Sequence, residues 1–220
     1  ATGTVKVLEA ARRQGGAHVI VASSSSVYGE TRVLPKNESL PARPISPYAA
    51  SKLATEAYSL AWAHSYGLPA LALRLFNVFG PLQPPLHTYA AVVPAFLSAA
   101  FQDQPLPVHG DGSQSRDFTF VESVVSVVVD ALLRKVSHED PVNLAFGSRV
   151  TLLELIGVME YVLDRQLPID FQPARVGDVA ISQADPSTLE SLFPYLEPTS
   201  LEAGIRSTVN WFKAARPWES

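Results

Sequence analysis

Cysteine is absent from the sequence, which excludes disulfide bonds and thiolate metal sites. No hydrophobic run reaches the roughly 18 residues of a membrane span. The longest candidate, residues 121–133, is interrupted by charged and hydroxyl side chains. No cluster of Lys and Arg offsets the net charge of −4, which argues against a nucleic-acid surface. The histidines show no metal-ligand spacing. We therefore expect a cytoplasmic protein that binds neither nucleic acid, membrane nor metal.

The sequence also lacks an initiating methionine and a signal-peptide layout. Its first residues, 1–13, have a helical pattern that is present from the start of the sequence. We therefore expect a fragment of a longer protein. The 220 residues are 47% hydrophobic and 17% charged. That composition and length suit a globular chain with a substantial core, in one large domain or two small ones.

Apolar runs alternate with helical patterns in the first half of the chain, which is typical of a parallel α/β sheet. Residues 18–22 and 70–75 are predicted to be buried strands. Between them, Ser46 as a cap and Pro47 at the first position predict a helix that ends near Gly67. The second half predicts further helices at 89–101, 121–136, 151–163 and from Thr199 or Ser200 to about 212, and strands at 106–109, 117–121, 142–145 and 169–171.

Tyr48 and Lys52 are the most informative pair, because residues four apart lie on one face of a helix. An ammonium group held beside a phenol favours the phenolate. Serines 23–26 follow the predicted strand 18–22, at the sheet edge where open α/β folds bind ligands. A phenol, an ammonium group and a serine hydroxyl together can move a proton off an alcohol carbon while a hydride leaves it. The set predicts alcohol–carbonyl redox chemistry.

Five runs, in order, resemble an extended short-chain dehydrogenase/reductase of the nucleotide-sugar 4-epimerase type, which acts on UDP-glucose or UDP-N-acetylglucosamine. They are Ser23–Gly29, Ser46–Lys52, Arg74–Pro81, Gly110–Gly112 with Arg116–Val121, and Arg175–Val179. The resemblance implies the C-terminal part of a Rossmann-like parallel sheet with a small mixed α/β substrate-binding domain. Residues 1–80 would form the remaining part of the NAD-binding domain, and a later segment, about 117–146, would also belong to it. Residues 81–220 would form mostly the substrate-binding cap.

The resemblance also implies residue roles. Tyr48 is the catalytic acid/base, Lys52 tunes it and binds the nicotinamide ribose, and Ser24 bonds the sugar hydroxyl. Ser23, Leu75 and Val78 join Tyr48 and Lys52 in holding NAD. Arg74 is either a ligand or half of a buried ion pair. The implied substrate contacts include phosphate-binding Asn77, the diphosphate clamp of Arg116 and Arg175, and a uracil-binding segment 107–109; the full set is Ser24, Ser25, Asn77, Ala91, Val92, Pro107, His109, Arg116, Arg175, Asp178 and Ser182.

Two departures from the family pattern are informative. The family's Gly-x-x-Gly-x-x-Gly phosphate loop is absent, as is the acidic residue that follows it. We therefore expect this chain alone to bind NAD poorly and to be inactive. Ser24, Ser25 and Ser26 stand where the related 4,6-dehydratases carry Thr-Asp-Glu, which disfavours elimination of water. The decarboxylating relatives also carry an acid at position 26 and are disfavoured.

The hypothesis is NAD-dependent 4-epimerisation of a nucleotide-diphosphate hexose through a 4-keto intermediate. Ser182 leaves more room beside the sugar than a tyrosine would, so N-acetylated sugars are expected to be tolerated. A UDP-uronate 4-epimerase, a nucleotide-sugar 4-ketoreductase and a non-catalytic NAD-binding scaffold stay as alternatives. The family usually forms homodimers through a four-helix bundle, for which Ala54, Ala57, Leu60 and Ala61 would form one packing face.

Overall fold

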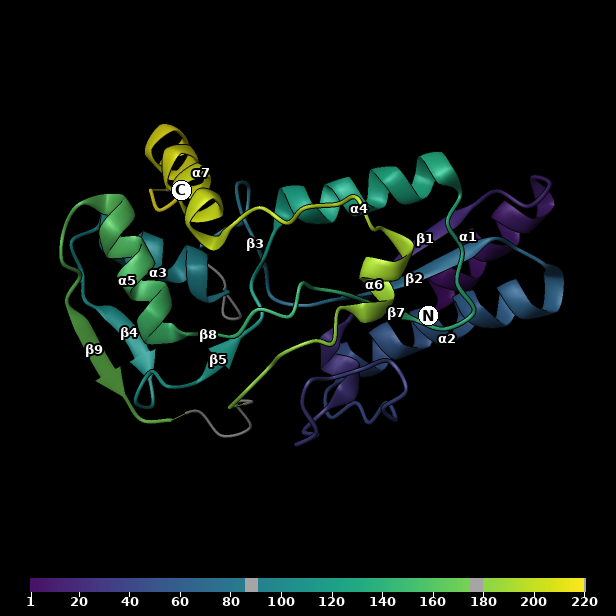
Figure 1. Ribbon diagram of the computed structural model, residues 1–220, viewed down its shortest axis with the longest axis horizontal. Coiled ribbons are helices and arrows are strands. Elements are labelled where there is room, and N and C mark those ends of the chain that lie inside the picture. The colour runs from purple at the N-terminus through teal and green to yellow at the C-terminus, as the bar shows by residue number, and fades with distance from the viewer. Residues whose placement is uncertain (86–90, 175–179, 220) are drawn as a thin grey trace. The chain divides into compact units, whose positions relative to one another are not determined.

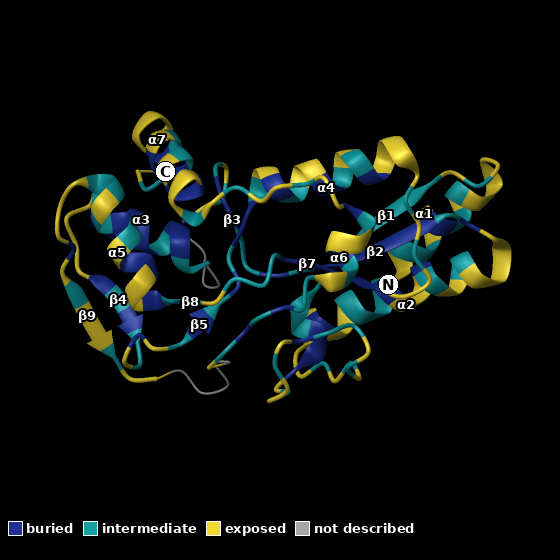
Figure 2. Ribbon diagram, viewed as in Figure 1, coloured by how far each residue is buried: buried dark blue, intermediate teal, exposed yellow. Residues whose placement is uncertain are grey.

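The computed structural model describes residues 1–85, 91–174 and 180–219, which divide into two compact units (Figure 1). The first unit contains residues 1–76, 124–147 and 184–196. The second contains residues 77–123, 148–183 and 197–220. Each unit has its own buried core, coloured dark blue in Figure 2. The chain has an α/β fold with parallel strands.

A three-stranded parallel sheet forms the centre of the first unit, in the order β1 (Val19–Ser24), β2 (Ala70–Leu75) and β7 (Val142–Leu144). Val19 of β1 is paired with Ala70 of β2, and Ser24 with Leu75. Both strands therefore end at the same edge of the sheet. The 3-10 helix η1 (Ser25–Tyr28) follows β1 directly, which places the serine run at that edge.

Helices cover both faces of this sheet. Side chains alternate along a strand, so neighbouring residues of β2 contact helices on opposite faces. Leu71 and Leu73 of β2 pack with Val127 and Ala131 of α4 (Val121–Arg134) and with α6 (Ser187–Leu192). Arg74 instead reaches α2 (Pro47–Tyr66), on the opposite face. Helix α1 (Thr2–Arg13) packs beside α2, where the Thr4 and Thr55 hydroxyls lie 3.2 Å apart.

Local sequence signals fix both ends of α2. The Ser46 side chain accepts a hydrogen bond from the Ala49 amide at 3.1 Å, and Pro47 occupies the first turn. Gly67 ends the helix with φ of 64°, a left-handed conformation that glycine adopts without strain. The helix therefore starts with Tyr48 in its first turn.

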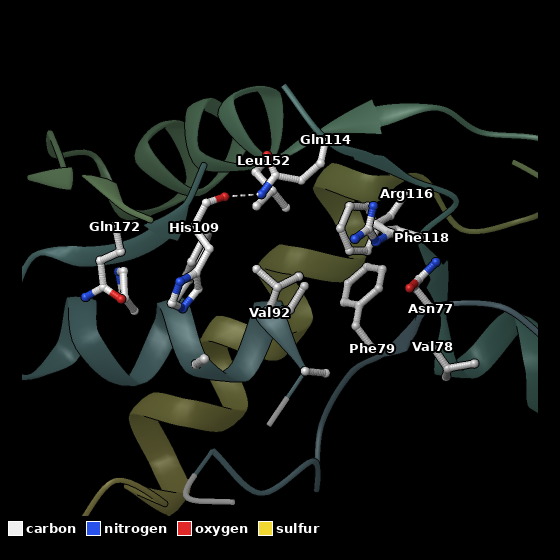
Figure 3. A pocket seen from close by; sticks show the side chains of 15 residues that line it. Asn77, Val78, Phe79, Val92, His109, Gln114, Arg116, Phe118, Leu152 and Gln172 are labelled. Carbon is white, nitrogen blue, oxygen red and sulfur yellow. Dashed lines mark hydrogen bonds between the residues drawn. The ribbon is translucent and has the colours of Figure 1, made fainter. Parts of the chain in front are cut away.

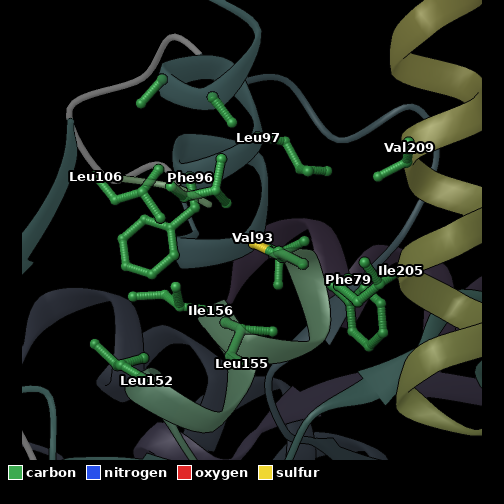
Figure 4. Packing of buried hydrophobic residues seen from close by; sticks show 14 of the residues in the cluster. Phe79, Val93, Phe96, Leu97, Leu106, Leu152, Leu155, Ile156, Ile205 and Val209 are labelled. Atoms are coloured by element: carbon green, nitrogen blue, oxygen red, sulfur yellow. The ribbon is translucent and has the colours of Figure 1, made fainter. Parts of the chain in front are cut away.

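The described residues of the second unit form three two-stranded sheets and three helices. β3 (Val78–Phe79) pairs with β6 (Thr119–Phe120), β4 (Leu106–His109) with β9 (Ile169–Gln172), and β5 (Ser115–Arg116) with β8 (Val150–Thr151). Helices α3 (Val92–Phe101), α5 (Leu152–Leu163) and α7 (Leu201–Ala215) surround an apolar core that contains Phe79, Phe96, Leu155 and Ile205 (Figure 4).

Most of the predicted elements are confirmed, with differences at their boundaries. The strand predicted at 18–22 continues through Ser24, so two of the serines belong to it. The strand predicted at 117–121 is confirmed only at Thr119–Phe120, which form β6; β5 is a separate short strand that precedes Asp117 and Phe118. Part of the helix predicted at 89–101 lies outside the described residues, and α3 begins at Val92. The last helix is capped by Ser200 and extends to Ala215.

Candidate active site

Tyr48 and Lys52 lie on one face of α2, one turn apart. The Lys52 Nζ atom is 5.7 Å from the centre of the Tyr48 ring and donates a hydrogen bond to the Ala22 carbonyl at 2.9 Å. Tyr48 is 57% exposed, so its phenol can meet a bound molecule. The ammonium group is held by β1, the strand that contains the first two serines of the run. This arrangement suits proton transfer at an exposed phenol with a fixed positive charge nearby.

Ser24 is the last residue of β1 and caps η1. Its Oγ atom accepts hydrogen bonds from the Ser26 amide at 3.2 Å and from the Ser26 hydroxyl at 2.9 Å. Because both contacts use lone pairs, the hydroxyl hydrogen of Ser24 is available to be donated. Ser25, the first residue of η1, is half-buried beside it. The chain therefore presents a donating hydroxyl at the strand end.

The residues proposed to hold NAD fall in both units. Ser23, Tyr48, Lys52 and Leu75 belong to the first unit, where Leu75 pairs with Ser24 across the parallel ladder. Ser23 is buried, and its hydroxyl donates to Glu56 at 2.7 Å. Val78 belongs to the second unit and lines the pocket there. Leu75 therefore lies beside Ser24 at the end of the sheet, whereas the Ser23 hydroxyl is bonded to Glu56 inside the protein.

A pocket of about 470 Å³ lies within the second unit (Figure 3). Six of the predicted substrate-binding residues line it: Asn77, Ala91, Val92, Pro107, His109 and Arg116. The pocket combines aromatic and aliphatic walls with a few polar groups, which is typical of a site for a small molecule. It is large enough for a substantial part of a nucleotide.

The polar groups of the pocket are held by the surrounding backbone. The Asn77 amide donates to the Asp117 carbonyl at 3.2 Å, and the Arg116 guanidinium donates to the Ser115 carbonyl at 3.0 Å. The Gln114 amide donates to the His109 carbonyl, as the dashed line in Figure 3 shows. A fixed guanidinium is suited to phosphate oxygens, because its planar donors can bind two of them at once.

Ser25 and Ser182 are described, but they do not line this pocket. Ser25 belongs to the first unit. Ser182 is buried in the second unit, where its amide donates to the Ser115 carbonyl at 3.0 Å, next to Arg116. Arg175 and Asp178 lie outside the described residues. Arg74 is one half of a buried ion pair with Glu56, which is one of the two interpretations that its sequence position allows.

Several lining residues were not predicted from the sequence, among them Phe79, Gln114, Phe118, Leu152 and Gln172. Gln114 and Phe118 flank Arg116, so their nearness in the sequence was an available signal. Gln172 reaches the pocket because β9 pairs with β4, which places it opposite His109. That pairing joins segments far apart in the chain, and no local pattern reveals it.

Comparisons with known proteins agree with this architecture. Residues 1–145 match the NAD dependent epimerase/dehydratase family. A UDP-glucose 4-epimerase of Mycolicibacterium smegmatis is 34% identical over 215 residues, covering 96% of this chain and 67% of the relative. The chain spans between 64% and 68% of the length of the curated relatives that it matches.

The fold is also similar to solved structures of nucleotide-sugar 4-epimerases. A UDP-N-acetylglucosamine 4-epimerase from Methanobrevibacter ruminantium, in complex with UDP-N-acetylmuramic acid, has a TM-score of 0.91 and 36% identity over 96% of this chain and 68% of its own. A UDP-glucuronic acid 4-epimerase from Bacillus cereus, with UDP-glucuronic acid and NAD, has a TM-score of 0.85 and 28% identity over 96% of this chain and 66% of its own. The motifs, the fold and these similarities agree, and the chain belongs to the NAD dependent epimerase/dehydratase family.

Proposed function

We propose that the protein catalyses NAD-dependent 4-epimerisation of a UDP-linked hexose through a 4-keto intermediate. The observation that carries this proposal is the position of Lys52 Nζ, 5.7 Å from the Tyr48 ring centre and bonded to the Ala22 carbonyl beside the serine run. Tyr48 removes the proton of the sugar C4 hydroxyl and later returns it. Lys52 stabilises the phenolate, and Ser24 donates a hydrogen bond to the same sugar oxygen.

The exposed Tyr48 side chain and the half-buried Lys52 side chain fit the polar groups of NAD. The Lys52 ammonium group has three donors, of which the Ala22 carbonyl takes one, so donors are left for ribose hydroxyls. When bound, NAD would supply the acceptor and donor for the hydride of the sugar carbon. The sequence has no glycine-rich phosphate loop. We therefore expect the 220-residue chain alone to bind NAD weakly, and tight binding in a calorimetric titration would contradict this.

The pocket of the second unit is proposed to hold the UDP part of the substrate. Arg116 and Asn77 supply donors for the phosphates, and Pro107 and His109 border the uracil. Arg175 is proposed to add to the diphosphate contacts, and Asp178 is proposed as a further substrate contact. A firmly held diphosphate and a loosely held sugar would allow the 4-keto sugar to rotate about its diphosphate linkage. The hydride could then return to the opposite face of the sugar ring.

An N-acetylated hexose is our proposed substrate among the possible UDP-sugars. The small side chains of Ala91 and Ser182 support this choice, and the relative from M. ruminantium is a UDP-N-acetylglucosamine 4-epimerase. Replacing Ser182 with Tyr should block turnover of UDP-N-acetylglucosamine and spare UDP-glucose. Equal loss of both activities would contradict the assignment, with Ser182→Ala and circular dichroism as controls for folding at this buried position.

A UDP-uronate 4-epimerase is the second candidate. It is favoured by the likeness to the B. cereus enzyme, whose structure contains UDP-glucuronic acid. A C6 carboxylate needs a cation or several hydrogen-bond donors beside the sugar. Parallel assays with UDP-glucose, UDP-N-acetylglucosamine and UDP-glucuronic acid therefore separate the two candidates.

We also propose a cytoplasmic homodimer that does not bind nucleic acid, with α2 contributing to the interface. Ala57 and Ala61 are exposed on this helix, and Tyr58 and Tyr66 are exposed there too. Small residues allow close approach of two helices. Analytical ultracentrifugation should find a dimer that Ala57→Glu weakens; a monomer for the wild type would contradict the proposal. Among the described residues, no helix has both the length and the apolar character of a membrane span.

The decisive assay uses the complete gene product, NAD and a UDP-hexose, with proton NMR to identify the sugar product. An epimerase converts the substrate to its 4-epimer without net change in NADH absorbance. Net consumption of NADH with a 4-keto sugar would identify a reductase, and no turnover of any of the three UDP-sugars would identify a non-catalytic scaffold. Either result would contradict the proposal.

A further inference from the structure

A buried ion pair joins α2 to the sheet directly beneath the serine run. The Arg74 guanidinium contacts the Glu56 carboxylate through two nitrogens, Nε at 3.0 Å and Nη2 at 2.6 Å. The Ser23 hydroxyl donates to the same carboxylate at 2.7 Å. The side chains of Arg74 and Glu56 are 5% and 4% exposed. Burial alone would lower the pKa of Arg74, but its bond to Glu56 raises it, so the guanidinium stays charged.

The same guanidinium also contacts the other side of the serine run. Its Cζ atom lies 4.6 Å from the centre of the Tyr28 ring, at the end of η1. The Tyr28 hydroxyl in turn donates to the Asn143 side chain of β7 at 2.7 Å. Ser24 therefore lies between two residues, Ser23 and Tyr28, that are both tied to the Glu56–Arg74 pair. This is a directional arrangement that apolar packing would not provide.

Glu56 also has a defined relation to the reactive pair. It follows Lys52 by four residues and Tyr48 by eight, so the three share one face of α2. At 1.5 Å per residue, Glu56 is about 6 Å from Lys52 and about 12 Å from Tyr48 along the helix axis. Fixing Glu56 against Ser23 thus fixes both the height and the rotation of α2 relative to the end of β1. The Lys52 bond to Ala22 adds a second connection one residue away.

We infer that Ser23, Glu56 and Arg74 are positioning residues that hold the Ser24 hydroxyl in register with Tyr48 and Lys52. A buried ion pair is by itself weak support for stability, because desolvation offsets the attraction between the charges. Its bidentate geometry and its bond to Ser23 instead give precise placement, which a reactive group needs from the residues behind it. The role in turnover rests on the proposed function, whereas the mechanical coupling does not.

The test compares Ser23→Ala with Ser59→Ala. Ser59 is the control because it is buried on α2, the helix that carries Glu56, and its hydroxyl donates to the Thr55 carbonyl, at 2.9 Å, rather than to the Glu56–Arg74 pair. The first readout is amide hydrogen exchange of the 220-residue chain. Loss of a hydrogen bond to a charged group should accelerate exchange at Ser24, Ser25 and Ser26 by about tenfold or more. Ser59→Ala should leave these amides unchanged.

The second readout is turnover by the complete gene product. Ser23→Ala should lower kcat by about tenfold with little change in KM, because substrate still binds but Ser24 is misplaced. Exchange and kcat that match those of Ser59→Ala would overturn the inference. If the wild type turns over no UDP-sugar, the proposed function fails. The exchange measurement still decides whether Ser23 holds the strand end to α2.

Discussion

The Lys52 ammonium group lies 5.7 Å from the centre of the Tyr48 ring, one helical turn along α2. The Ala22 carbonyl fixes it there from the neighbouring strand. This geometry holds a positive charge beside the phenol that is proposed to act as the acid/base. The first prediction follows from this relationship.

Tyr48→Phe removes the only group proposed to take and return the proton. We expect kcat of the complete gene product to fall by about 10²- to 10⁴-fold, the usual contribution of a positioned acid/base, with KM little changed. Tyr58→Phe is the control, since Tyr58 is on the same helix and stacks edge-on against Trp62. Comparable activity of both variants would exclude Tyr48 as the acid/base.

Arg116→Met tests the pocket of the second unit. Loss of a charge-assisted contact costs about 1.5–3 kcal/mol, so UDP affinity should fall by roughly 10- to 150-fold in calorimetry. Arg149→Met is the control, because Arg149 is exposed and does not line the pocket. Equal affinities for UDP in the two variants would show that the nucleotide binds elsewhere.

Gly204→Ala tests how closely α7 packs against the β3–β6 pair. A Cβ atom at Gly204 would lie 2.8 Å from the Phe79 ring and 2.9 Å from the Phe120 ring. Alanine gains about 1 kcal/mol in helix propensity, but overpacking costs about 1–3 kcal/mol. We expect a net loss in the free energy of unfolding by urea, and weaker UDP binding, since Phe79 lines the pocket.

The control for that variant is Gly157→Ala, on α5. Nothing lies within 4 Å of a Cβ atom at this exposed position, so the gain in helix propensity is unopposed. Gly157→Ala should stabilise the chain by up to about 1 kcal/mol. If both substitutions stabilise, the contact between α7 and the Phe79 ring is looser than the distances indicate.

Glu154→Gln tests the start of α5, where Leu152 enters the pocket. The Thr151 amide and hydroxyl both donate to the Glu154 carboxylate, at 2.7 and 2.8 Å, and lower its pKa. A lowered pKa adds stability above the unfolded value of about 4.5, and this is lost as the pH falls through the folded value. Glutamine keeps a capping oxygen but cannot titrate.

Urea unfolding at pH 7 and at pH 3 measures this effect. Wild type should be more stable than Glu154→Gln at pH 7, and the difference should shrink at pH 3. Because the carboxylate is exposed to solvent, the difference is expected to be small. A constant difference at both pH values would contradict the assignment of the shift to the folded state.

Local signals in the sequence determine some elements and leave others open. Helix α2 matches its prediction because Ser46, Pro47 and Gly67 act within a few residues of its ends. Helix α6 was not predicted: it is short and is stabilised by the Asp185 carboxylate, which accepts from the Ser187 amide at 3.0 Å. Strands β5 and β6 have separate partners, β8 and β3, which a single local run cannot reveal.

The same distinction applies to the candidate site. Tyr48, Lys52 and Ser24 were found from spacing on a helix and position at a strand end, both of which are local. For the polar network beneath them, the sequence indicated that Arg74 could form a buried ion pair but did not identify Glu56 as its partner. The two residues come together only in the folded chain. In the second unit, Gln172 lies opposite His109 only through strand pairing.

The most direct test of the account follows an isotope at the sugar's C4 atom. The complete gene product, with NAD, receives a UDP-hexose that carries deuterium on C4. Because the abstracted hydride returns to the same carbon, the 4-epimer should form with its deuterium retained, as measured by mass spectrometry and proton NMR. A 4-epimer that has lost its deuterium to solvent, or no 4-epimer at all, would contradict the central claim.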